Sequence, residues 1–171
     1  EETLQLITPQ TRLLIINSPA NPTGGVTPKG EIDKLVAGLE KWPDVAIMSD
    51  EIYDHMVYDG ETHVCLLSYP SIRDRLILLN GWSKTYAMTG WRLGWVVAPE
   101  RHVRDLEKLA QNLYISPAAP SQYAALACFE PAALEIVESR RRAFEARRDY
   151  LVPALRALGF KIPVMPTGGF F

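Results

Sequence analysis

The chain has 171 residues, about the size of one domain, and 47% of them are hydrophobic, so it can bury a core. The formal net charge is −2 with acids and bases interspersed, which gives no reason to expect nucleic acid or an acidic membrane as a partner. Two well-separated cysteines, Cys65 and Cys128, predict a reduced, cytoplasmic protein, and no apolar run approaches the roughly 18–20 residues that span a bilayer.

The first half of the chain alternates predicted strands with a predicted helix. Three short apolar runs are typical of buried strands: RLLII (12–16), VAIMSD (45–50) and RLILLNG (75–81). A Pro-, Gly- and Asn-rich loop (18–28) leads into a helix that has Thr27 as its expected N-cap, Pro28 as its first residue and Pro43 as its stop. This order of a strand, a helix and a second strand predicts that the two strands pair in parallel through a right-handed crossover.

The second half is predicted to be mainly helical. LGWVVAP (93–99) is a fourth strand candidate, and helices are expected over 99–113, 119–129 and from Pro131 to Leu158. Acidic residues are interleaved with the arginines of the last helix, which favours a solvated surface over a nucleic-acid face. The predicted fold class is therefore α/β, with a mostly parallel sheet flanked by helices.

Unusual polar residues cluster where the predicted strands end. Asn21 follows the first strand, Asp50 and Tyr53 lie at the end of the second, and Ser83 and Lys84 follow the third. Ligands of open α/β sheets bind beyond the carboxyl ends of the strands. We therefore expect these five side chains at one edge of the sheet.

These residue types suit pyridoxal phosphate (PLP). Lys84 lies in an apolar segment that also carries a cation, where an amine loses its proton more easily and can form a Schiff base with an aldehyde. PLP needs an anion at its ring nitrogen, donors at its phenolate oxygen and a cation at its phosphate. Asp50 would supply the first, Tyr53 and Asn21 the second, and Arg92 the third.

Three segments resemble the class I/II aminotransferases, a family of fold-type I PLP enzymes: NSPANPTGGV (17–26), SDEIYDHMVYDG (49–60) and NGWSKTYAMTGWRLGWVVAP (80–99). The resemblance implies that Lys84 is the Schiff-base lysine and that Asp50 pairs with the pyridine nitrogen. It implies that Tyr53 and Asn21 donate to the phenolate oxygen and that Arg92 binds the phosphate. The implied fold is the aspartate aminotransferase-like large domain.

One position departs from the family pattern. Many members carry a phosphate-binding serine three residues before the lysine, where this chain has Gly81, so either Ser83 or the Gly81 N–H would compensate. The Asn21–Pro22 bond resembles one that is often cis in relatives. The three histidines lack ligand spacing, so we predict no metal site.

The resemblance also implies a domain division. Residues 1–130 would form the C-terminal portion of the large PLP-binding domain without its N-terminal part, and residues 131–171 the interdomain helix and the start of the small C-terminal domain. The chain starts without methionine and stops within an apolar segment, so we expect a piece of a longer protein that is inactive alone.

The implied reaction is a ping-pong transfer of an amino group between an amino acid and a 2-oxo acid in a homodimer, with Lys84 as general base and acid. Two other functions stay open. One is a different PLP reaction, such as that of a C–S β-lyase or an ACC-synthase-like enzyme; the other is the PLP-sensing domain of a transcription regulator. Structural roles also stay open: a strand-end cap for Asp50, core packing for Tyr53, a turn for Asn21 and an ion pair for Arg92.

Overall fold

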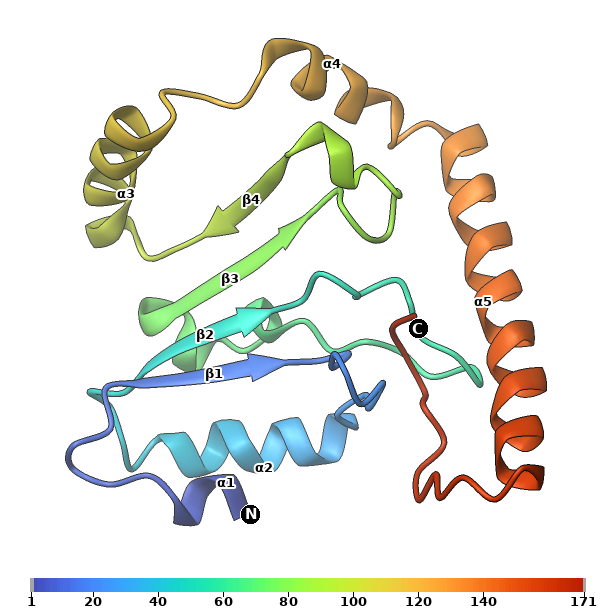
Figure 1. The fold of residues 1–171 in the computed structure, drawn as a ribbon. Helices are drawn as coiled ribbons and strands as arrows, with labels where there is room; N and C mark the ends of the chain where they lie inside the picture. Colours follow the sequence, from blue (N-terminus) through green and yellow to red (C-terminus); the bar gives the residue numbers. More distant parts are fainter. Residues whose placement is uncertain (1, 171) are drawn as a thin grey trace.

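The computed structural model describes residues 2–170 and contains one four-stranded sheet in the order β1-β2-β3-β4 (Figure 1). The strands are β1 (Leu13–Asn17), β2 (Ala46–Asp50), β3 (Leu76–Gly81) and β4 (Gly94–Val97). The first three run parallel, and β4 pairs antiparallel with β3. The prediction of an α/β fold with a mostly parallel sheet is confirmed.

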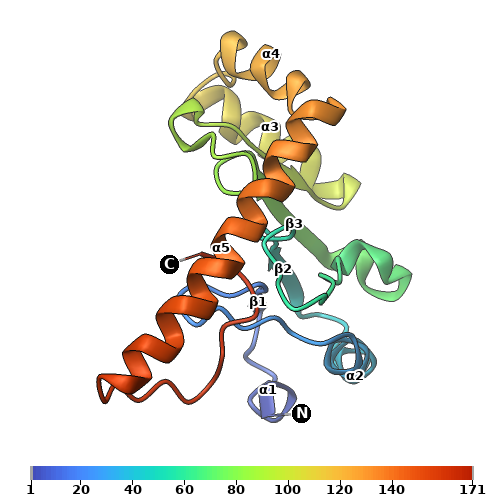
Figure 2. The same ribbon diagram turned by 90° about the vertical axis from the view of Figure 1, so that its right-hand side faces the viewer.

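Helices flank this sheet: α1 (Glu2–Gln5), α2 (Lys29–Leu39), α3 (Glu100–Leu113), α4 (Ala119–Ala127) and α5 (Pro131–Ala157). Short 3-10 turns occupy Leu66–Ser68, Pro70–Arg75 and Thr89–Trp91. The helix α2 lies under the sheet, α3 and α4 lie beyond β4, and α5 runs past the carboxyl ends of the parallel strands (Figures 1 and 2). None of the helices within residues 2–170 combines the length and apolarity that a membrane crossing requires.

The core lies between α2 and the sheet. Its buried members are Ile7, Ile32, Val36, Leu39, Val45, Ile47, Leu66, Ile72 and Leu76. The buried Arg75 side chain donates to the carbonyls of Leu39 (2.9 Å) and Val45 (3.1 Å) and to that of Trp42. It thereby ties the end of α2 to the segment that leads into β2.

Two local predictions are wrong. The helix α2 begins at Lys29 rather than Pro28, because Pro28 has an extended ψ of 150° and occupies the N-cap position itself. Thr27 therefore caps nothing, and its N–H donates to Ser18 Oγ (2.9 Å). Strand β1 is not fully buried either: Leu13 is 42% and Ile15 63% exposed, because the described helices leave that face of the sheet uncovered.

Candidate active site

The parallel register brings the ends of the first three strands level. Asn17 lies opposite Asp50, and Asp50 lies opposite Leu79. The loops that follow β1, β2 and β3 consequently leave the sheet at one edge, beside α5 (Figure 1). This edge carries Asn21, Asp50, Tyr53, Ser83 and Lys84, which follow or end the three parallel strands.

A chain of hydrogen bonds joins the first two loops. Asn17 Nδ2 donates to the Asp50 carbonyl (3.2 Å), and Asn17 Oδ1 accepts from the Asn21 N–H (2.8 Å). Asn21 Nδ2 then donates to Tyr53 Oη (3.1 Å), and the Asn21–Pro22 bond is cis, as expected. Asn17 was missed from the sequence, although a polar last residue on a buried-looking strand signals such a role.

The Lys84 amine lies against two aromatic rings. Its Nζ is 5.8 Å from the centroid of Tyr53 and 5.6 Å from that of Phe170, and these two rings meet edge to face at 5.7 Å. Tyr53 is buried. Cations interact favourably with ring faces at such distances. Lys84, Tyr53 and Asn21 are therefore brought together, and Phe170 is an additional residue that only the tertiary structure reveals.

Asp50 ends β2 with its side chain half-buried. Its Oδ1 accepts the N–H of Ile52 (3.2 Å), and within residues 2–170 no hydrogen bond reaches Oδ2. A carboxylate with one oxygen fixed and one open can accept a proton-bearing ring nitrogen. Its chemistry fits the anion that the pyridine nitrogen of PLP requires.

The loop that carries Lys84 is closed by its own hydrogen bonds. The Ala87 N–H donates to the Lys84 carbonyl (3.0 Å), and Thr89 Oγ1 donates to the Ser83 carbonyl (2.8 Å). Arg92 has a left-handed φ of 52°, is exposed, and donates from Nη1 to the Thr89 carbonyl (2.9 Å). Among the described residues, Arg92 makes no hydrogen bond to Asn21, Tyr53 or Lys84 and stands apart from that group.

Gly81 has no room for a side chain. An added Cβ would lie 2.8 Å from Gly94 Cα and 2.9 Å from the Leu93 carbonyl oxygen, both backbone atoms. The Gly81 N–H already donates to Asn80 Oδ1 (2.6 Å), whereas Ser83 lines the cavity beside Lys84. Of these two positions, Ser83 is the one that lines the cavity beside Lys84.

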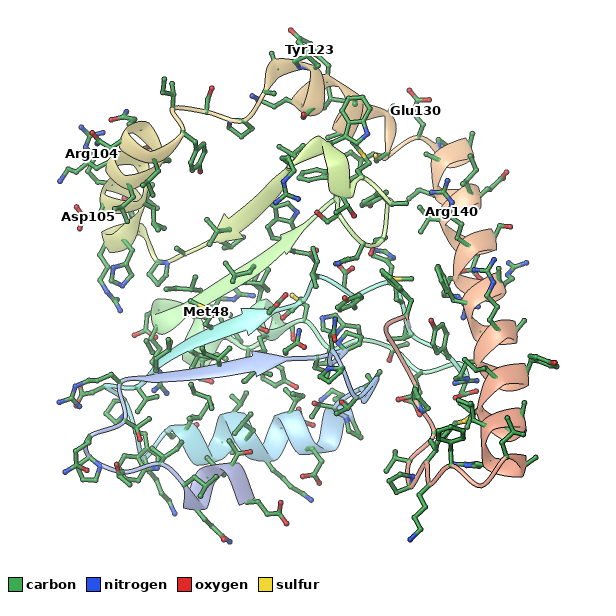
Figure 3. All side chains as sticks on the ribbon, in the orientation of Figure 1. Met48, Arg104, Asp105, Tyr123, Glu130 and Arg140 are labelled. Atoms are coloured by element: carbon green, nitrogen blue, oxygen red, sulfur yellow. The ribbon has the colours of Figure 1, made fainter. Side chains whose placement is uncertain are left out.

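A cavity of about 170 Å³ opens beside Lys84. The lysine loop, the segment after β2, helix α5 and Phe170 line it. Arg140 brings positive charge from α5, whereas Arg141 is paired with Glu138 and Glu145. Figure 3 shows Arg140 on the side of α5 that faces the lysine loop. The cavity can therefore admit a small anionic molecule next to the amine.

Helix α5 is tied to the segment after Tyr53. Arg148 donates to both carboxylate oxygens of Asp59 (2.7 Å each) and to the Pro166 carbonyl (2.9 Å), and it packs over the Tyr58 ring. Hydrogen bonds from Arg148 hold the pKa of Asp59 below its ordinary value, and burial raises that of Tyr58 to about 12. Tyr58 also donates its hydroxyl to the Gly169 carbonyl, which anchors the strand-like segment before Phe170.

Comparisons with known proteins identify the family that the chain resembles. Residues 1–171 match the sequence model of the family described as Aminotransferase class I and II. The chain is 38% identical to Aromatic-amino-acid aminotransferase 2 of Thermococcus litoralis, covering 100% of the chain and 44% of that protein. It is 41% identical to an arginine–pyruvate transaminase of Pseudomonas aeruginosa, over 100% of the chain and 43% of the relative.

Solved structures of aminotransferases superpose closely on this chain. The crystal structure of the aromatic aminotransferase from Pyrococcus horikoshii superposes with a TM-score of 0.93 at 36% identity, covering 99% of this chain and 45% of that one. The structure of aspartate aminotransferase from Thermus thermophilus with maleate superposes with a TM-score of 0.87 at 35% identity. The match covers 97% of this chain and 43% of that one. The chain thus spans less than half the length of these relatives.

Proposed function

The chain belongs to the aminotransferase class I and II family, and we propose that it is the lysine-bearing segment of a PLP-dependent aminotransferase. The enzyme would move an amino group between an amino acid and a 2-oxo acid with ping-pong kinetics. One observation carries the proposal: the Lys84 amine lies beside Tyr53, which is hydrogen-bonded to Asn21, at the sheet edge where Asp50 ends β2.

The residues of this edge fit PLP. Lys84 would hold the cofactor as a Schiff base, Asp50 would face its ring nitrogen, and Tyr53 Oη and Asn21 Nδ2 would face its phenolate oxygen. Ser83 and Arg92 would serve the phosphate, Ser83 from within the cavity and Arg92 from the end of the lysine loop. The 3.1 Å contact between Asn21 and Tyr53 supports the shared role of these two donors.

Bound PLP supplies an electron sink for the substrate carbon. The residues of the chain move the proton and orient the cofactor. The freed Lys84 amine takes a proton from the substrate Cα and returns it, as general base and acid. Asp50 keeps a proton on the ring nitrogen, and Tyr53 and Asn21 fix the direction of the phenolate oxygen. The rings of Tyr53 and Phe170 pack beside the amine and limit the directions it can take.

The wider architecture follows from the same family membership. We propose that residues 1–130 belong to the large domain and 131–171 to the interdomain helix and the start of the small domain, within a longer polypeptide. We further propose that this polypeptide works as a homodimer in the cytoplasm, and that the 171-residue chain is inactive alone, because it spans only about 44% of a full-length relative.

The test is a visible absorbance spectrum of the full-length protein with PLP, before and after adding amino acids. We expect a band from PLP bound to lysine that disappears with particular donors, chosen to include aromatic amino acids, aspartate and arginine. Lys84→Ala should remove both the band and transamination while circular dichroism stays unchanged, since Lys84 is half-buried beside the cavity and is not part of the core cluster.

Other results would contradict the proposal. A Lys84→Ala protein that still transaminates would exclude the lysine. A band that no amino donor converts would favour the PLP-sensing regulator, and a substrate lost by elimination rather than transamination would favour a β-lyase or an ACC-synthase-like enzyme.

A further inference from the structure

Asp54 lies between the segment that carries Tyr53 and the loop that carries Lys84. Its Oδ2 accepts from Asn80 Nδ2 (2.9 Å), and its Oδ1 accepts from Thr85 Oγ1 (3.3 Å) and from the His55 N–H (2.8 Å). Three donors from two separate parts of the chain thus converge on a single carboxylate.

Two of these donors bracket the lysine. Asn80, near the end of β3, also accepts the Gly81 N–H through Oδ1 (2.6 Å), so it fixes the strand just before the loop. Thr85 follows Lys84 directly and is only 6% exposed. Side chains bonded to Asp54 therefore come from the end of β3, before the lysine loop, and from the residue directly after Lys84.

We propose that Asp54 is a positioning residue that fixes the backbone of Lys84, and so the direction in which its amine meets Tyr53 and the aldehyde of PLP. This inference rests on the proposed function, because it concerns the same lysine. Lysine has a flexible four-carbon stem, so its amine can be aimed only if the Cα is fixed and the stem is packed. Misplacing a reacting group by about 1 Å can cost about 100-fold in rate.

The chemistry explains why a carboxylate occupies this position. An ionised carboxylate has acceptor sites on both oxygens, whereas an asparagine would present one acceptor oxygen and an NH₂ group. An NH₂ group cannot accept from Asn80 Nδ2 or from Thr85. Asp54→Asn must therefore lose one of the three bonds. An NH₂ group turned toward Asn80 breaks that link, and one turned toward Thr85, whose hydroxyl can accept instead of donate, leaves the His55 N–H without an acceptor.

A simpler role must be separated from this one. The Asp54 N–H donates to the Glu51 carbonyl (3.0 Å), so residues 51–54 form a turn that the Asp54 side chain could merely stabilise. Thr85 distinguishes the roles, because its hydroxyl lies outside that turn. Thr85→Val removes the hydroxyl at nearly constant shape, and Thr85→Ser retains it.

The experiment measures how fast Lys84 of the cofactor-free, full-length protein reacts with PLP. The aldehyde condenses with the amine and releases water, and borohydride then reduces the C=N bond to a stable secondary amine. Peptide mass spectrometry counts the modified Lys84 at each time. We expect Asp54→Ala and Thr85→Val each to slow the reaction about 10- to 100-fold.

Three further variants sharpen the result. Thr85→Ser should restore the wild-type rate. The Asp54→Ala/Thr85→Val double variant should be no slower than Asp54→Ala alone, because Asp54→Ala already removes the link to Thr85. Asp105→Asn is the matched control: Asp105 is an exposed α3 residue paired with Lys108 (3.0 Å), and it lies on the far side of the sheet from α5 (Figure 3). Its rate should equal the wild type.

Wild-type rates in Asp54→Ala and Thr85→Val would overturn the positioning role and leave the proposed function intact. So would a Thr85→Ser protein as slow as Thr85→Val, or effects of the two substitutions that multiply. A wild-type protein that forms no bond to PLP at Lys84 would overturn the proposed function and the positioning role together.

Discussion

The two halves of the sheet differ in how well they are covered. The half built from β1, β2, β3 and α2 encloses a core in which Leu39 and Ile47 are fully buried. In the other half, all four residues of β4 are exposed and α3 buries none of its residues, even though it is strongly two-sided in its sequence. The covered half carries Asp50, Tyr53 and Lys84, so the site rests on the part of the chain that packs against itself.

The contrast teaches that a hydrophobic pattern specifies an element but not its partner. The apolar residues of α3, such as Leu109 at 58% exposure, are as regularly spaced as those of α2. Only α2 has a sheet face within residues 2–170 to pack on. Burial depends on what another surface supplies, whereas helix formation depends on spacing within the segment itself.

The largest expected effect tests this contrast directly. Ile47→Ala should destabilise the full-length protein by about 4 kcal/mol, because it leaves a cavity in a fully packed core. Leu109→Ala, the matched change on α3, should cost within about 0.5 kcal/mol in a protein whose α3 surface stays as open as it is within residues 2–170. Urea denaturation monitored by circular dichroism measures both. A cost above about 2 kcal/mol for Leu109→Ala would show that another surface covers α3 in the full-length protein.

The sequence predicts the parts of the site that depend on nearby residues better than those that depend on distant ones. The three strand ends are short-range features, so Asn21, Asp50, Tyr53 and Lys84 could be assigned to one edge from the order of strands and loops. Phe170 could not, because it comes to Lys84 only through the long return of the chain along α5 and the pairing of Val57 with Gly168. Contacts between distant segments depend on tertiary packing that local patterns do not encode.

The next effect concerns the seam between the two halves. Gly81 and Gly94 pair across β3 and β4, and a Cβ on Gly81 would meet the backbone of the neighbouring strand. Gly81→Ser should therefore cost about 3 kcal/mol, since β4 must move away. It should weaken PLP binding too, although the serine matches the family pattern. Thermal unfolding and a PLP titration measure these two effects. A serine variant that is as stable as the wild type and binds PLP more tightly would show that the backbone of β4 leaves room for a side chain at position 81.

The smallest effect is a pH dependence inside the covered half. Glu51 is buried, and its carboxylate contacts His63 Nε2 (2.7 Å), the Leu66 N–H (3.0 Å) and Ser49 Oγ (2.9 Å). Burial alone would raise its pKa, but the hydrogen bonds with His63, Leu66 and Ser49 together outweigh burial and lower it below the ordinary value of 4.5. The folded protein thus holds this proton less tightly than the unfolded chain does.

The sign of the effect follows from linkage. The stability that the lowered pKa contributes is present above the unfolded value near 4.5 and is lost as pH falls through the lower folded value. Glu51→Gln should cost about 2 kcal/mol at pH 7, because a charge-assisted hydrogen bond is lost. The cost should shrink as pH falls below 4.5, where the wild type gains its proton as well. Urea denaturation of both proteins across this range measures the difference, and a cost that grows toward low pH would show that folding raises the pKa of Glu51 rather than lowering it.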